Sequence, residues 1–115
     1  MKKLNFNIEF LPEAAEFINM TDVKAREKIL YNMKKAQYMS NQELFKKLNN
    51  VIWEFRTLYN GQAYRLFAFW DKVNDSDTLV IATHGIVKKT QKAQIQEIHK
   101  AMNIRSRYMQ VKGTL

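Results

Sequence analysis

The chain has 115 residues, of which 46% are apolar, and it contains two histidines and no cysteine. This length and composition predict one globular domain over residues 1–115, and they argue against disulfides, thiolate metal sites and multi-histidine metal sites, so we expect no cofactor. No apolar run approaches the about 20 residues that span a bilayer, and polar residues interrupt the N-terminal segment that a signal peptide would need. We therefore expect a soluble, cytoplasmic protein that makes no membrane contact.

The charge points to a class of partner. Nineteen Lys and Arg stand against eleven Asp and Glu, which gives a net charge of +8. A basic surface of this size favours a polyanion, most often nucleic acid, through phosphate contacts that do not depend on base sequence. The alternative is an ordinary soluble protein with a basic isoelectric point.

The first part of the chain predicts a strand followed by two helices. Apolar and polar residues alternate from Leu4 to Phe10, as in a half-buried strand. Pro12 suits the first turn of a helix, and Thr21-Asp22 suits the cap of a second helix. The second helix carries an apolar stripe at Ala25, Ile29, Met33 and Ala36.

The second part predicts a sheet and one more helix. Ser40-Asn41-Gln42-Glu43 has a capping-box pattern, which predicts a short helical turn through Phe45 and Leu48. Strands follow at about 51–59, 63–71 and 78–87. A last helix is expected to run to about Arg105, with Ile95, Ile98 and Met102 facing inward.

The order β-α-α-β-β-β-α predicts an α+β fold with a mostly antiparallel sheet, packed against an N-terminal helical hairpin and a C-terminal helix. Helices are expected to cover one face of the sheet.

The two middle strands place two arginines opposite each other. Asn60-Gly61 predicts a tight type I′ hairpin, and pairing outward from this turn sets Arg56 against Arg65. Like charges in such a pair destabilise a sheet by up to about 1 kcal/mol. Glu54 lies on the same face and could neutralise one of them in a surface ion-pair cluster. Alternatively, the pair is held for an oxyanion, because guanidinium groups bind phosphate with two hydrogen bonds.

A second basic segment lies where the last strand ends and the last helix begins. Lys88, Lys89 and Lys92 could bind phosphate there together with the free amides of a helix N-terminus, or they could form a solvated strand end. His84 lies inside an apolar strand and is either a core histidine or an acid/base group. The aromatic residues on the Trp53 face of the hairpin could stack on bases, but core packing is the more usual role of aromatics in strands.

Taken together, these residues resemble a known pattern. A strand with Trp-Glu-x-Arg, a short turn, Tyr-Arg followed by apolar residues, and His-Gly-x-x-Lys-Lys-Thr-x-Lys opening the last helix resembles the RelE/ParE superfamily of bacterial toxins. The HigB-like branch, which includes phage-derived relatives, is the most similar. The residues that carry the resemblance are Trp53, Glu54, Arg56, Tyr64, Arg65, His84, Gly85, Lys88, Lys89, Thr90 and Lys92.

The resemblance implies the toxin of a type II toxin–antitoxin system, held inactive by an antitoxin that is often a helix-turn-helix protein encoded beside it. Many members cut mRNA in the ribosome without a metal. In that activity Arg56 and Arg65 would hold the scissile phosphate, and Glu54 or, second, His84 would accept the proton of the 2′-hydroxyl. Lys88, Lys89 and Lys92 would bind flanking phosphates. A ParE-like inhibitor of DNA gyrase and a non-catalytic nucleic-acid-binding relative from a mobile element are the alternatives.

Overall fold

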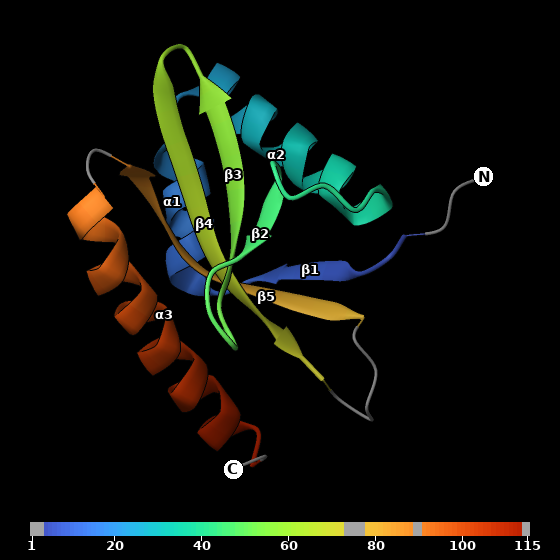
Figure 1. The fold of residues 1–115 in the computed structure, drawn as a ribbon, viewed down its shortest axis with the longest axis vertical. Coiled ribbons are helices and arrows are strands. Elements are labelled where there is room, and N and C mark those ends of the chain that lie inside the picture. The colour runs from blue at the N-terminus through green and yellow to red at the C-terminus, as the bar shows by residue number, and fades with distance from the viewer. Residues whose placement is uncertain (1–3, 73–77, 89–90, 114–115) are drawn as a thin grey trace.

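The computed structural model describes residues 4–72, 78–88 and 91–113, and the side chains of 91–93 are not described. Its elements are β1 (Asn7–Phe10), α1 (Pro12–Met20), α2 (Val23–Tyr38), β2 (Phe45–Lys47), β3 (Trp53–Tyr59), β4 (Gln62–Asp71), β5 (Leu79–Lys88) and α3 (Gln91–Val111). The strands form one sheet in the order β1-β5-β4-β3-β2, in which only β1 and β5 run parallel (Figure 1). The predicted α+β class with a mostly antiparallel sheet is confirmed.

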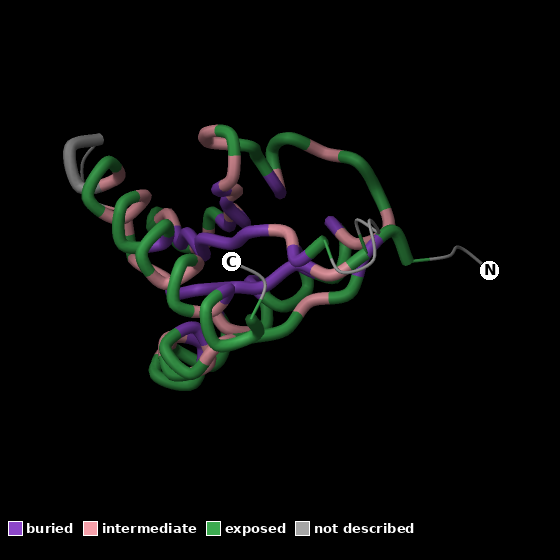
Figure 2. The backbone as a smooth tube through the Cα atoms, turned by 90° about the horizontal axis from the view of Figure 1, so that it is seen from below, coloured by how far each residue is buried: buried purple, intermediate pink, exposed green. Residues whose placement is uncertain are grey.

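Helices cover both faces of the sheet, where the sequence predicted one. The core between the sheet and the pair α1 and α2 contains Tyr64, Leu66 and Ala68 of β4. The opposite side of the same strand supplies Phe67 and Phe69 to a second core beneath α3. Figure 2 shows the buried backbone gathered in the strands, with the outer faces of the helices exposed. Both sides of β4 are apolar because this strand is the middle one of five.

Local signals placed the two N-terminal helices correctly. Pro12 stands at the start of α1, where its missing N–H costs nothing. The carboxylate of Asp22 caps α2 by accepting hydrogen bonds from the amides of Lys24 and Ala25. All four residues of the expected stripe of α2 are buried: Ala25, Ile29, Met33 and Ala36. The first strand is shorter than predicted, since β1 begins at Asn7.

The helical turn predicted after Ser40 is wrong. The side chain of Asn41 accepts a hydrogen bond from the amide of Glu43 and closes a turn, after which Phe45–Lys47 form the edge strand β2. This strand pairs with β3 and sets Phe45 against Phe55 and Lys46 against Glu54. The buried ring of Phe45 packs in the core, and this packing favours a strand over a capped helix.

The hairpin between β3 and β4 has the predicted register. Asn60 and Gly61 both adopt positive φ, 51° and 77°, as a type I′ turn requires. Arg56 therefore pairs directly with Arg65.

An irregularity between β4 and β5 changes which residues of β5 face α3. Phe67 pairs with His84 and Ala68 with Ala82, so Thr83 is an extra residue in the ladder. The hydroxyl of Thr83 donates to the carbonyl of Phe67. As a result, Ile81 and His84 both lie on the α3 side, although they are three positions apart along the strand, where a regular strand would place them on opposite sides.

The last helix is longer than predicted and shows a different face to the sheet. It runs to Val111, and Ile95 and Met102 are exposed, so their predicted inward orientation is wrong. Ile98 and the fully buried Ala101 face the core instead. Near the end of α3, the hydroxyl of Tyr108 donates a 2.6 Å hydrogen bond to Asp71 at the end of β4. Among the residues that the structure describes, no helix is long and apolar enough to cross a membrane.

Candidate functional site

The α3 side of the sheet carries two neighbouring rows of side chains at the hairpin. The strand pairing defines one row across β2, β3, β4 and β5 as Lys46, Glu54, Phe67 and His84. It defines the next row, toward the turn, as Arg56, Arg65 and Ile86. The register alone therefore places both arginines and Glu54 on one face of the sheet, as the sequence predicted.

Glu54 is the centre of this group. Its side chain is buried, with 2% of its surface exposed, and its Oε1 atom lies 3.5 Å from Nε of Arg56 and 3.4 Å from Nε of Arg65. The other oxygen, Oε2, accepts a 2.9 Å hydrogen bond from the side-chain amide of Gln94 on α3. One carboxylate therefore holds two guanidinium groups side by side, while the first turns of α3 cover it.

The two arginines differ in exposure. Arg56 keeps 31% of its side chain exposed, while Arg65 keeps 11%. The Nε atoms of both are buried and, within the described part of the chain, make no hydrogen bond of good geometry, although each forms an ion pair with Oε1 of Glu54. A buried donor without a partner costs about 1–3 kcal/mol. Because both Nε atoms are closed to solvent, an anion from solvent would have to meet the outer nitrogens of the guanidinium groups.

Burial dominates the electrostatics of the group. It raises the pKa of Glu54 above its ordinary value, although Arg65, Arg56, Lys88 and Lys46 act in the opposite direction. Burial also lowers the pKa of the Arg65 guanidinium, and the negative charge of Glu54 raises this pKa in part. A guanidinium remains protonated at physiological pH even so. The site therefore presents two fixed positive charges beside one buried carboxyl group.

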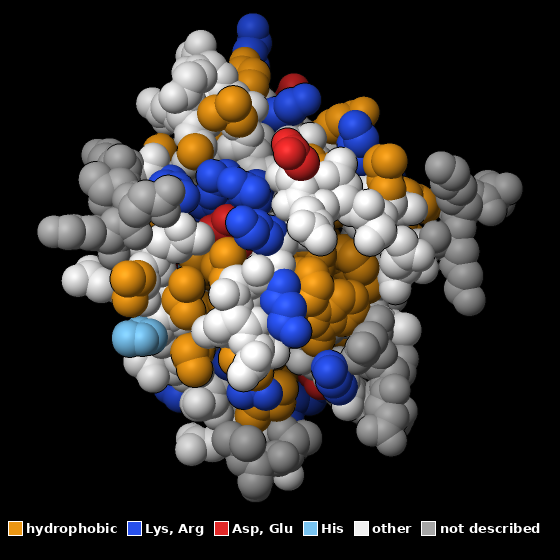
Figure 3. Space-filling view, viewed as in Figure 1, with side chains coloured by type: hydrophobic (Ala, Val, Ile, Leu, Met, Phe, Trp, Pro, Cys, Tyr) orange, Lys and Arg blue, Asp and Glu red, His pale blue; other side chains and the backbone are white. Residues whose placement is uncertain are grey.

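Two lysines add to the positive charge. Lys46 of the edge strand β2 lies opposite Glu54 in the strand pairing, and Lys88 lies opposite Ala63 at the end of β5. Both are close enough to lower the pKa of Glu54. Figure 3 shows Lys and Arg side chains gathered over the hairpin, with an acidic side chain among them. The basic cluster, Lys46, Arg56, Arg65 and Lys88, thus sets four cations around one carboxylate.

His84 lies apart from this exposed charge. It is 1% exposed and its ring stacks on Phe67 with centroids 5.0 Å apart. Nδ1 lies 2.9 Å from the hydroxyl of Thr83, and Nε2 lies 3.1 Å from Glu97 of α3. Burial lowers the pKa of His84, and Glu97 opposes this effect in part. With both nitrogens engaged, His84 has the surroundings of a core histidine that helps to hold α3 on the sheet.

The sequence missed two members of the site and placed two others where the structure gives no side chain. Lys46 was missed because its segment was assigned to a helix, and Gln94 because α3 was given the wrong inward face. Periodicity gave no signal for Lys46, because Leu44-Phe45-Lys46-Lys47-Leu48 does not alternate between apolar and polar residues. Lys89 and the side chain of Lys92 lie outside the described residues.

The chemistry available here is binding of an oxyanion and transfer of a proton. Among the described residues, no three Asp, Glu, His or Cys side chains gather closely enough to hold a metal ion. Guanidinium groups are planar donors that match phosphate oxygens, and Glu54 has a pKa raised toward the range useful for acid/base chemistry.

Comparison with known proteins gives a family. A family model described as "phage derived protein Gp49-like (DUF891)" matches residues 16–106. No curated protein matches the chain. The matched segment begins within α1 and contains the whole sheet except β1, most of α3, and the complete basic cluster. The chain therefore belongs to the Gp49-like family of phage-derived proteins, which is part of the RelE/HigB-like toxin–antitoxin superfamily.

Proposed function

We propose that this protein is the toxin of a type II toxin–antitoxin system and that it cuts mRNA on the ribosome without a metal, in the manner of the HigB-like branch. Membership of the Gp49-like family supports the first part. Two guanidinium groups that share one buried carboxylate carry the second part. A cognate antitoxin, encoded nearby and of the helix-turn-helix kind, is the proposed partner that keeps the protein inactive.

The arginine pair suits a phosphate whose charge increases during reaction. Arg56 and Arg65 would bind the two non-bridging oxygens of the scissile phosphate and stabilise the charge that develops on them. Lys46 and Lys88 lie on either side of the pair and would bind the neighbouring phosphates. A site built only for stability would have no need of four cations around one carboxylate, because like charges opposite each other weaken a sheet.

Glu54 is the proposed proton acceptor, and its Oε2 atom is the position at which transfer would occur. Oε1 is shared by the arginines, whereas Oε2 receives the amide of Gln94. The substrate 2′-hydroxyl would replace that amide, lose its proton to Oε2, and form a bond to phosphorus as the bond from phosphorus to the 5′-oxygen breaks. The leaving oxygen takes a proton from water. The products are a 2′,3′-cyclic phosphate, which water can open to a 3′-phosphate, and a 5′-hydroxyl.

Induced expression tests this function. Without an antitoxin the protein should arrest growth and fragment translated mRNA, with cyclic phosphate or 3′-phosphate at the new ends. Arg56→Gln and Arg65→Gln should each abolish fragmentation, while Arg107→Gln, the same change at an exposed position of α3, should not. Equal fragmentation by all three variants would overturn the role of the pair.

The same experiment separates the competing functions. Growth arrest with intact mRNA and with DNA damage would instead identify a gyrase inhibitor, whose action requires no phosphate site at the hairpin. Absence of both arrest and RNA cleavage, with RNA binding preserved, would identify a non-catalytic relative. Co-expression of the neighbouring reading frame should restore growth if that frame encodes the antitoxin.

A further inference from the structure

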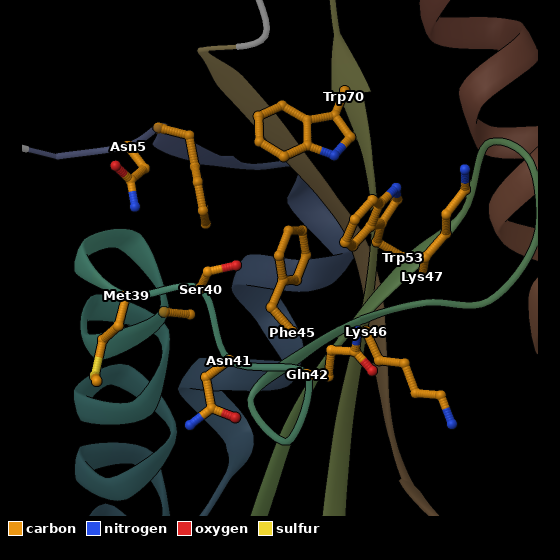
Figure 4. Close-up of a pocket in the computed structure, with 12 residues that line it drawn as sticks. Asn5, Met39, Ser40, Asn41, Gln42, Phe45, Lys46, Lys47, Trp53 and Trp70 are labelled. Atoms are coloured by element: carbon orange, nitrogen blue, oxygen red, sulfur yellow. The ribbon is translucent and has the colours of Figure 1, made fainter.

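A pocket of about 460 Å³ lies next to the basic cluster, at the edge of the sheet where β2 meets α2. Its volume falls within the range of about 300–1,000 Å³ that small ligands occupy. Figure 4 shows Phe45 near the middle, with Trp53 and Trp70 along one side and the 39–42 segment along the other. This pocket is on the α1/α2 side of the hairpin, so it is separate from the Glu54 site.

The walls of the pocket are aromatic and remain open to solvent. Trp53 stacks on Phe45 with ring centroids 4.8 Å apart, and Trp70 stands nearly perpendicular to Trp53, at 81°. Both tryptophans are only partly buried. Two indoles at right angles form a corner, in which a flat ring can stack on one face and meet the edge of the other. Both indoles also pack against the core between the sheet and α1 and α2, which holds them in place.

The rim of the pocket is polar and positively charged. Lys46 and Lys47 follow Phe45 on β2, and in Figure 4 Gln42 lies beside Lys46 while Asn41 lies across the pocket from Lys47. Lys46 also lies opposite Glu54 in the strand pairing, so this residue both lines the pocket and belongs to the basic cluster. A negatively charged chain bound at the arginines would therefore pass Lys46 on its way to the pocket.

We infer that this pocket binds one unstacked base of a single-stranded RNA whose neighbouring phosphates lie on the basic cluster. Stacking on Trp53 and Trp70 would hold the base, Lys46 and Lys47 would contact its phosphates, and the amides of Asn41 and Gln42 could bond to its edge. This inference deepens the proposed function, because it takes the RNA substrate as the ligand. It makes the pocket a second, cleavage-independent determinant of which RNA binds.

Intrinsic fluorescence provides a direct assay, because the chain has two tryptophans and both line the pocket. The probe is a short single-stranded RNA with 2′-O-methyl groups, which cannot be cleaved through the 2′-oxygen. A matched probe carries abasic nucleotides, so that it keeps the phosphates and lacks the bases. We expect the complete probe to quench the fluorescence on binding, and the abasic probe to bind about 5- to 100-fold more weakly with little quenching.

Variants test the walls and the rim separately. Trp70→Ala should weaken binding of the complete probe about 5- to 100-fold and leave the abasic probe unaffected, whereas Trp70→Phe should lose less. Lys47→Met should weaken both probes, and Lys34→Met, the same change on the exposed face of α2, should weaken them less. Because the two probes are also compared on the unchanged protein, the test does not depend on the Trp70 variants folding.

The outcomes for the pocket and for the proposed function are distinct. Equal binding and equal quenching by the two probes would overturn the pocket, even if the protein cleaves mRNA. Base-dependent quenching in a protein that cleaves nothing would support the pocket and count against the nuclease. If no RNA quenches the tryptophans but the antitoxin does, the pocket is a protein-docking site and the inference fails.

Discussion

Replacing Arg65 with glutamine should destabilise the protein in a way that depends on pH. The pKa of Glu54 is already raised above its ordinary value of 4.5 because the carboxyl group is buried, and Arg65 is the largest of the charges that lower it. A raised pKa means that the folded state binds the proton more tightly than the unfolded state. The stability that this group contributes is therefore fully present below the unfolded pKa and is lost as pH rises through the folded pKa.

Arg65→Gln enlarges that loss. Without this guanidinium the folded pKa of Glu54 rises further, and each additional pKa unit removes about 1.4 kcal/mol at neutral pH. Breaking a wholly buried pair costs about 3–5 kcal/mol, but Arg56 remains and the carboxyl group can take up a proton, so we expect about 1–3 kcal/mol. Well below pH 4.5, the ordinary pKa of the carboxyl group, Glu54 is protonated in the folded and unfolded states of both proteins, and the difference should shrink to a few tenths of a kcal/mol.

Urea unfolding from acid to neutral pH, followed by tryptophan fluorescence, measures this difference. Arg56→Gln should cost less, since that side chain is more exposed and is the weaker influence on Glu54. In a Glu54→Gln background the effect of Arg65→Gln should lose its pH dependence. A cost for Arg65→Gln that is the same at every pH, or that persists unchanged in the Glu54→Gln background, would refute the coupling between these two residues.

Three further predictions concern the parts that surround the site. Gln94→Ala uncovers Oε2 of Glu54 and should raise the single-turnover rate of RNA cleavage. Glu54→Gln removes the proton acceptor and should lower that rate, and an equally large fall in rate for Gln94→Ala would contradict the proposed displacement of the amide. Gly85→Ala would bring a Cβ into the ring of Phe17 and should cost about 1–3 kcal/mol in urea unfolding, with partial recovery when Phe17 is shortened to leucine. For Asp71, burial alone would raise the pKa, but hydrogen bonds from Lys112, just after α3, and from Tyr108 leave the pKa below its ordinary value. The stability that Asp71 contributes is therefore lost as pH falls through the folded pKa. Asp71→Asn should flatten this acid-induced loss in urea unfolding, and an unchanged acid profile would exclude this role of Asp71.

Local signals in the sequence determined the hairpin and its register. Asn60 and Gly61 accept positive φ more readily than other residues, so two adjacent positions fixed the pairing of Arg56 with Arg65. The same holds for Asp22, whose carboxylate satisfies amides within three residues of it. Each of these features depends on contacts between near neighbours in the chain, and such contacts can be recognised without knowing the fold.

Tertiary packing decided what surrounds the arginines. The extra residue at Thr83 turned His84 toward α3, and a pattern of period two cannot reveal such an irregularity. The polar residues Gln94 and Glu97 of α3 face the sheet, where Gln94 contacts Glu54 and Glu97 contacts His84. The apolar Ile95 of the same helix is exposed. Hydrophobic periodicity predicts the opposite, with Ile95 buried and the polar residues exposed. It fails here because buried polar groups need hydrogen-bond partners, and these partners come from distant segments of the chain.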